Sequence, residues 1–183
     1  MKTIKFIAAS ALLACTASTF AHVVLDQPMA MAGSSYRAVF KVAHGCEGLP
    51  TTGLAVLIPA GVQGAKPMPK PGWALAVRTD KLAVPYTSHG KTVSEDVTEI
   101  RWTAQSKDAA LPEAHYDEFI LRATLPATAG PLWFKIVQTC DDGSRQSRNE
   151  WTQIPPEGVS TKGLKSPAAL LQVEPGADPH AHH

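Results

Sequence analysis

The stretch LWFKIVQTCDDG, residues 132–143, combines the pattern of a β-strand with the signal of a hairpin turn. Its first part is rich in aromatic and β-branched residues, which are enriched in strands. The Asp-Gly step at its end tolerates the positive φ that tight hairpin turns require. We therefore expect a strand over Leu132–Cys140, a turn at Cys140–Gly143 and a second, antiparallel strand over Asn149–Ile154.

Similar short runs of Val, Ile, Thr and aromatic residues recur along the chain, separated by many of its 15 prolines and 13 glycines. No segment shows a long helical period. The runs predict strands over His22–Asp26, Tyr36–Ala43, Gly53–Ile58, Ala74–Thr79, Glu99–Ala104 and Tyr116–Thr124, with Lys91–Thr98 as an additional candidate. Strands of this number and spacing are typical of an all-β fold, an immunoglobulin-like or cupredoxin-like antiparallel β-sandwich.

Two of the three cysteines, Cys46 and Cys140, fall on the same parity as the apolar, core-facing positions of their strands. A bridge between two strand ends requires this placement. An even pair of cysteines in an exported protein predicts one disulfide. The alternative is a pair of buried free thiols.

The start of the chain has the features of a secretory signal peptide. Lys2 and Lys5 precede a short apolar run, and small residues lead to Ala21. These features predict cleavage between Ala21 and His22, and a periplasmic or secreted protein. The alternative is a lipoprotein signal at LLAC, which would leave a lipidated Cys15.

The expected organisation is a signal peptide at 1–21, a β-sandwich at 22–155 and a C-terminal extension at 156–183. The formal net charge of the full chain is +1 and becomes −1 when the two lysines of the signal peptide are removed. Because the sequence shows no basic patch, we expect no nucleic-acid partner.

His22 would become the first residue of the mature chain. It would then present its α-amine and its imidazole together, and the amine nitrogen and Nδ1 can bind one metal ion as a chelate. Both groups have ordinary pKa values near neutral pH, so that little work is needed to deprotonate them. Two such nitrogens in one plane suit the tetragonal preference of Cu(II), which makes Cu(II) the favoured cofactor.

Several segments occur in the order AHVVLDQP, HGCEGLPTTGLAVLIPAGV, KPMPKPGW, VTEIRW, YDEF and LWFKIVQTCDDG, followed by EW. In order and spacing, from His22 to about Pro155, the chain resembles the YcnI-type copper-binding domain family. This resemblance implies an exported immunoglobulin-like sandwich that binds copper through its processed N-terminal histidine and acts in copper sequestration or trafficking. It also implies a copper-transport membrane protein or a copper chaperone as partner.

The resemblance further implies a carboxylate ligand in the YDEF segment and a tryptophan beside the metal. The carboxylate maps to Glu118 first and Asp117 second, and the tryptophan maps to Trp151. His115 departs from the family, whose members often carry Glu or Tyr there. Strand parity places His115 and Asp117 on one face and Glu118 on the other. Two ligand sets therefore stay open, His22 with a carboxylate and His22 with His115.

The chain has two further metal-binding signals. The His-rich tail, with His180, His182 and His183, predicts an auxiliary metal site. His44 lies two residues before Cys46, but the expected disulfide would remove that cysteine as a ligand.

The motifs of several enzyme classes are missing from the sequence, which has no Gly-rich phosphate loop, no Ser-centred nucleophile elbow and no HExxH. We therefore expect a binding protein and no catalytic residues. One alternative is a histidine-brace copper oxidase or monooxygenase acting on polysaccharides, although an aromatic content of 7% argues against a flat aromatic binding face. The other alternative is an interaction domain without a metal.

Overall fold

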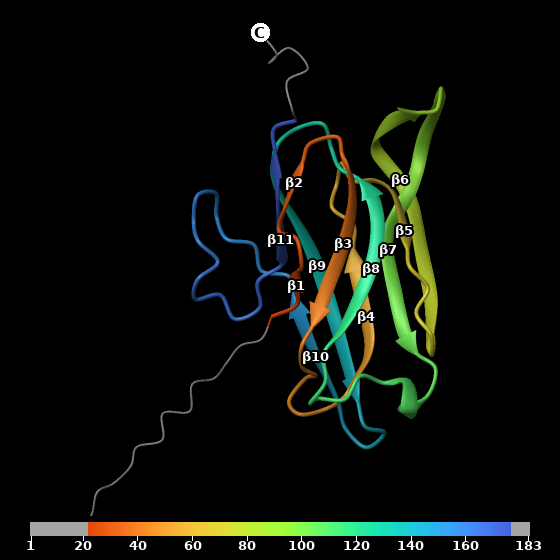
Figure 1. The fold of residues 1–183 in the computed structure, drawn as a ribbon, viewed down its shortest axis with the longest axis vertical. Coiled ribbons are helices and arrows are strands. Elements are labelled where there is room, and N and C mark those ends of the chain that lie inside the picture. Colours follow the sequence, from red (N-terminus) through yellow and green to blue (C-terminus); the bar gives the residue numbers. More distant parts are fainter. Residues whose placement is uncertain (1–21, 177–183) are drawn as a thin grey trace, which may run out of the picture.

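The computed structural model describes residues 22–176 as two β-sheets packed face to face (Figure 1). The first sheet has four strands in the order β1 (Val24–Leu25), β3 (Ser35–Val42), β8 (Asp117–Thr124) and β5 (Gln63–Pro67). The second sheet has seven strands, in the order β2 (Met29–Met31), β11 (Ala169–Glu174), β9 (Gly130–Asp141), β4 (Thr51–Leu57), β7 (Lys91–Ala104) and β6 (Trp73–Ser88), with β10 (Gln146–Trp151) paired to β9. The expected all-β sandwich is confirmed.

Within the described residues, the helical content is one short 3-10 helix, η1 (Lys107–Ala109). None of the helices described is long and apolar enough to cross a membrane. The expected signal peptide, Cys15 and the three histidines of the C-terminal tail lie outside the described residues.

The hairpin predicted from the opening stretch is present as β9 and β10, with Asp141 opposite Gln146. Its turn is held by Asp142, whose carboxylate accepts hydrogen bonds from the backbone N–H groups of Ser144 and Arg145. A hydrogen bond from the Ser144 hydroxyl, together with these two backbone bonds, lowers the pKa of Asp142. β10 follows this turn directly and therefore starts at Gln146, earlier than predicted, and it ends at Trp151, short of Ile154.

Three strands of the structure, β2, β5 and β11, were not predicted. β11 lies in the segment expected to be a C-terminal extension, where it pairs with β9 on one side and with β2 on the other. The sheet therefore continues to Glu174, beyond the expected domain end at residue 155. The run AALLQVE is short and apolar, and periodicity alone does not assign such a run to a strand.

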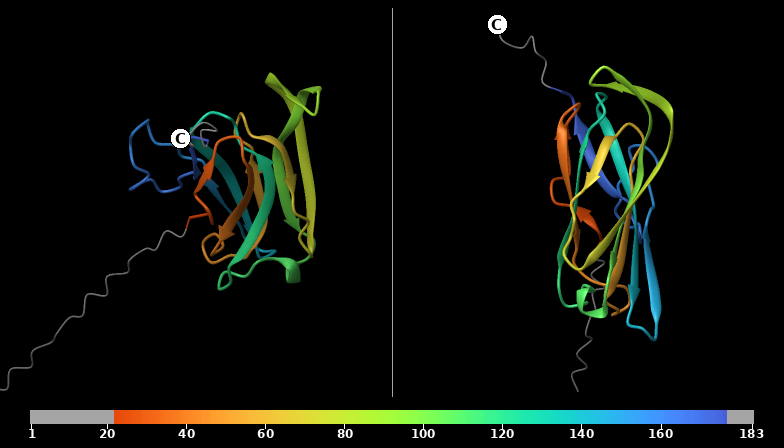
Figure 2. Two further views of the ribbon diagram at one scale, coloured as in Figure 1. Left: turned by 45° about the horizontal axis from the view of Figure 1, so that its top comes forward. Right: turned by 90° about the vertical axis from the view of Figure 1, so that its right-hand side faces the viewer.

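The strands predicted at Ala74–Thr79 and Glu99–Ala104 belong to a much longer hairpin. β6 has 16 residues and β7 has 14, so that Lys91–Thr98 forms one strand with the segment after it. The tip of this hairpin projects beyond the sandwich (Figure 2). Its outer residues are exposed on both faces, and they therefore lack the alternation that identifies a half-buried strand.

The core lies between the two sheets and is rich in aromatic contacts. Phe40 of β3 meets Phe134 of β9 edge to face, with ring centroids 5.4 Å apart. Phe119 of β8 meets Trp102 of β7 in the same way at 5.7 Å. Such pairs contribute about 0.5–1.5 kcal/mol each beyond the area that they bury. These contacts tie the four-stranded sheet to the seven-stranded sheet.

A disulfide between Cys46 and Cys140 lies at one end of this core, as the sequence predicted. Both cysteines are fully buried, and their Cα atoms are 5.7 Å apart. The bridge connects the loop after β3 to the end of β9 and therefore links the two sheets.

Candidate metal centre

His22 and His44 are brought to the same end of the sandwich by the pairing of β1 with β3. These strands are antiparallel, with Val24 opposite Lys41 and Leu25 opposite Phe40. The residue that precedes β1 therefore lies beside the residue that follows β3. His22 is two residues before Val24, and His44 follows β3, so the two imidazoles share one neighbourhood.

The indole of Trp151 forms the wall of this neighbourhood. The His22 ring meets it edge to face, with centroids 5.5 Å apart and planes at 82°. The His44 ring meets the same indole at 6.2 Å and 84°. Trp151 itself is only 4% exposed. Two imidazoles from the segments that flank β1 and β3 therefore contact one buried tryptophan of the seven-stranded sheet.

Gln138 of β9 lies next to this tryptophan and is fully buried. Its side-chain oxygen accepts a hydrogen bond of 3.1 Å from Nε1 of Trp151. Its side-chain nitrogen donates to the His44 carbonyl and to the Thr51 hydroxyl, each at 2.7 Å. One amide therefore connects the tryptophan to the backbone of a histidine.

The loop that carries His44 is fixed at the next two residues. The Gly45 N–H donates to the Glu113 carboxylate at 2.6 Å. A Cβ at Gly45 would lie 1.7 Å from the Leu49 carbonyl oxygen, so that only glycine fits there. Cys46 follows and is held by the disulfide. The backbone on the C-terminal side of His44 is thus anchored at two successive residues.

His22 is half-buried and lines a cavity of about 210 Å³. Thr161 and Leu170 line the same cavity and come from the segment between β10 and β11 and from β11 itself. That segment projects from the side of the sandwich near β1 and β11 (Figure 1). Nε2 of His22 is buried, which leaves Nδ1, the nitrogen nearer the main chain, as the one suited to chelation with the α-amine.

The three residues predicted as a third ligand lie at the start of β8. Asp117 forms an ion pair with Lys70 at 2.7 Å. Glu118 lies opposite Lys41 on the neighbouring strand. His115 is exposed in the turn before β8, where its backbone N–H donates to the Pro112 carbonyl. The three residues therefore have different neighbours in the structure.

The strand order separates these residues from His22. β3 lies between β1 and β8, with Lys41 opposite both Val24 and Glu118. Two strand spacings, about 10 Å, therefore separate the Cα atoms of Val24 and Glu118. Of the residues predicted for the site, the structure brings together His22 and Trp151, and it adds His44.

The comparison with protein families covers the same part of the chain. The family model described as "Domain of unknown function (DUF1775)" matches residues 22–173. This chain belongs to the DUF1775 family. The resemblance to YcnI-type proteins is confirmed at this level, because the YcnI family is the DUF1775 family.

A solved structure is similar to this DUF1775 chain, and its title is "Crystal structure of an uncharacterized protein from Nocardia farcinica reveals an immunoglobulin-like fold". The two chains are 25% identical with a TM-score of 0.61, and the match covers 83% of this chain and 97% of the other. No curated protein matches the chain. The likeness supports the immunoglobulin-like form of the DUF1775 sandwich.

Within residues 22–176 of this DUF1775 protein, no group of three or more His, Cys, Asp or Glu side chains is placed to hold a metal ion. A chelating N-terminal histidine changes this requirement, because it supplies two nitrogens from one residue. His22 and His44 would then provide three nitrogen donors. The sequence analysis missed His44 because it treated this residue only as a neighbour of Cys46. Its place beside His22 follows from the pairing of β1 with β3, which was not predicted from the sequence.

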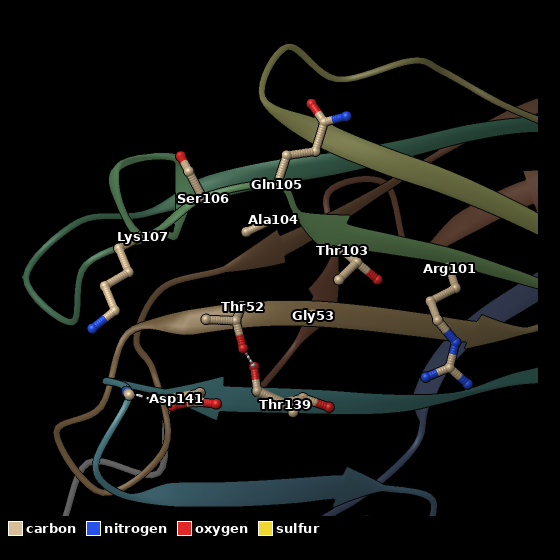
Figure 3. Close-up of a pocket in the computed structure, with 11 residues that line it drawn as sticks. Thr52, Gly53, Arg101, Thr103, Ala104, Gln105, Ser106, Lys107, Thr139 and Asp141 are labelled. Atoms are coloured by element: carbon tan, nitrogen blue, oxygen red, sulfur yellow. Dashed lines mark hydrogen bonds between the residues drawn. The ribbon is translucent and has the colours of Figure 1, made fainter.

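A different cavity of the DUF1775 domain, of about 420 Å³, opens on the outer face of β4, β7 and β9 (Figure 3). Thr52 and Thr139 lie in its lining and are linked by a hydrogen bond of 3.4 Å from the Thr52 hydroxyl to the Thr139 carbonyl. Arg101 and Lys107 border it. Its lining residues include no histidine, and the cavity is separate from the one that contains His22.

Proposed function

We propose that this DUF1775 protein is an exported copper-binding protein, with Cu(II) held by the α-amine and imidazole of His22 once residues 1–21 are removed. It would act in copper sequestration or trafficking in the periplasm or outside the cell. The observation that carries this proposal is the packing of the His22 ring against the buried indole of Trp151, with a second imidazole against the same indole.

The surroundings of His22 suit a bound cation. A tryptophan ring attracts a cation through its negative face and keeps water away from it, and an ion within about 6 Å of the ring gains about 0.5–2 kcal/mol. The family match also begins at His22, which fits a mature domain that starts at this residue. Imidazole and amine nitrogens are donors that Cu(II) prefers.

The proposed role is binding and transfer of the ion, without catalysis. The cavity at His22 is only about 210 Å³ and is lined by small or aliphatic residues such as Val24, Pro28 and Ala169. A polysaccharide oxidase would need a broad, flat face with aromatic side chains around the metal. The partner that fits a transfer role is a copper-transport membrane protein or a copper chaperone.

Titration of the mature chain that begins at His22 with Cu(II), followed by tryptophan fluorescence and calorimetry, tests this function. We expect one tightly bound Cu(II) per chain, besides weaker binding by the His-rich tail, and quenching of tryptophan fluorescence by the ion near Trp151. The variant His22→Ala should lose at least about 100-fold in affinity, because it keeps the amine but loses the imidazole of the chelate. His115→Ala is the matched control. Full affinity in His22→Ala would rule out the proposed site.

A further inference from the structure

We propose that His44 is the third ligand of the copper site and that Gln138 is its positioning residue. This inference rests on the proposed function, because it concerns the same ion. It assigns to His44 the place that the sequence analysis left open among Glu118, Asp117 and His115.

The first argument is that both histidines contact the same indole. The rings of His22 and His44 both contact the indole of Trp151 edge to face, at centroid distances of 5.5 and 6.2 Å. They reach it from the beginning of β1 and from the end of β3, which are adjacent and antiparallel. An ion chelated by His22 beside this indole would therefore have the His44 imidazole as its neighbour.

The second argument concerns the ring nitrogens of His44. Its Nδ1 lies within hydrogen-bond distance of the Gly45 carbonyl, which can only accept. A hydrogen bond to that carbonyl requires the proton on Nδ1, and in that tautomer Nε2 would be the ligating atom. A histidine ligand whose other nitrogen donates to a backbone carbonyl is a common arrangement at metal sites, because that bond fixes the ring.

The third argument is the hydrogen bonding of Gln138. Nε1 of Trp151 can only donate, and the His44 carbonyl can only accept. These two partners settle which end of the amide faces each of them, with the oxygen toward Trp151 and the nitrogen toward His44. The Gln138 amide therefore sets the distance between the backbone of His44 and the indole of Trp151. Because Gln138 is fully buried, replacing it would leave these polar groups without their partner.

The competing residues are placed less well. Asp117 is engaged with Lys70, and Glu118 lies two strands away from β1. A Cu(II) ion with the His22 amine, the His22 imidazole and the His44 imidazole would have three nitrogen donors. That donor set suits the tetragonal geometry of Cu(II).

Electron paramagnetic resonance of the Cu(II)-loaded mature chain tests the ligand, because it counts the coordinated nitrogens. We expect three nitrogens in the wild-type protein, two in His44→Ala with affinity lower by about 10–100-fold, and no change in the control His115→Ala. An unchanged spectrum and affinity in His44→Ala would overturn the role of His44 while leaving the function of His22 intact. A wild-type chain that binds no Cu(II) would overturn both.

The variants Gln138→Leu and Gln138→Glu test the positioning role. Gln138→Glu keeps the shape and an acceptor for Trp151, and it covers the case in which Gln138→Leu does not fold. In a variant with a native circular dichroism spectrum, we expect the Cu(II) to remain bound with altered g and hyperfine values and affinity lower by about 10-fold. A change in stability alone, with the wild-type copper spectrum, would show a merely structural Gln138 and overturn this part of the proposal.

Discussion

Trp151 uses two different parts of its side chain at the candidate site. Its Nε1 donates to the buried oxygen of Gln138, and its ring packs against His22 and His44. The indole therefore contributes both to the stability of the sandwich and to the shape of the site. Substitutions can separate these contributions.

Trp151→Phe should keep much of the aromatic wall but lose the hydrogen bond. We expect it to lower the free energy of unfolding by about 1–3 kcal/mol, because the Gln138 oxygen would be buried without a donor. Urea denaturation measures this loss. Trp133→Phe, at a half-buried position of the same strand pair, is the control and should cost less. An equal cost for the two variants would contradict a special role for the bond.

Gly45 is a second residue whose contribution to the His44 loop can be tested by a single substitution. In Gly45→Ala, the new methyl group would lie 1.7 Å from the Leu49 carbonyl oxygen, so that the loop must move. We expect a loss of about 2–4 kcal/mol of stability and weaker Cu(II) binding, measured by thermal unfolding and titration. In the control Gly53→Ala, the nearest atom is 3.4 Å away, at Thr139, and the loss should be small. A Gly45→Ala protein as stable as the control would contradict a rigid His44 loop.

The sequence predicted part of the site at this scale. His22 was identified because its own amine and imidazole can chelate a metal ion at the expected N-terminus. Trp151 was identified from the resemblance of the chain to the YcnI-type family. His44 was not identified, because its place beside His22 follows from the pairing of β1 with β3. A two-residue strand such as β1 carries too little pattern to predict its register.

At the scale of elements, β9 is the strand on which the other parts of the site depend. β11 pairs with its first half and β10 with its second half, while β4 lies on its other side. It supplies Gln138 and Cys140 to the site and to the disulfide. The hairpin β9–β10 was predicted because its turn and alternation are local, whereas β11 pairs across a long connection.

Deleting β11 should therefore damage the sandwich. In a chain that ends at Pro155, the fully buried Leu171 and Val173 would be lost from the core, at about 1.5–3 kcal/mol each. We expect this chain to be unfolded or to melt at much lower temperature in calorimetry. A chain that ends at Gly176 retains β11 and should melt like the full protein. Equal melting temperatures for the two chains would contradict the place of β11 in the sheet.

The disulfide links the same strand to the His44 loop. Replacing both cysteines, Cys46→Ser with Cys140→Ser, removes a bridge that spans 94 residues of sequence. In the chain-entropy model, a loop of this length contributes about 4–5 kcal/mol. We expect a lower urea midpoint and weaker Cu(II) binding, because the loop after β3 would lose its anchor. If affinity were unchanged in the folded double variant, the bridge would not help to position His44.

At the scale of the whole molecule, the candidate site lies where the two sheets meet. His22 and His44 flank β1 and β3 of the four-stranded sheet, and Trp151 and Gln138 belong to the seven-stranded sheet. An ion held there by His22 and His44 together would bind the folded protein more tightly than the unfolded chain, which keeps only the His22 chelate. It would therefore stabilise the fold, by at most about 2.7 kcal/mol at a free concentration 100 times Kd. The sandwich as a whole was predictable because alternation and turn signals recur along the chain. The place where the two sheets meet at the candidate site was not, because it depends on pairing between strands that are far apart in the sequence.

The measurement that bears most directly on copper binding by the N-terminal residue compares two chains that differ only at the first nitrogen. One chain begins with the free α-amine of His22, and the other is acetylated at that nitrogen, which keeps every side chain but turns the His22 amine into an amide. With Cu(II) titrated into both, we predict one tightly bound ion in the first chain and at least about 100-fold weaker binding in the second. Equal affinity in the two chains would contradict the chelate at His22.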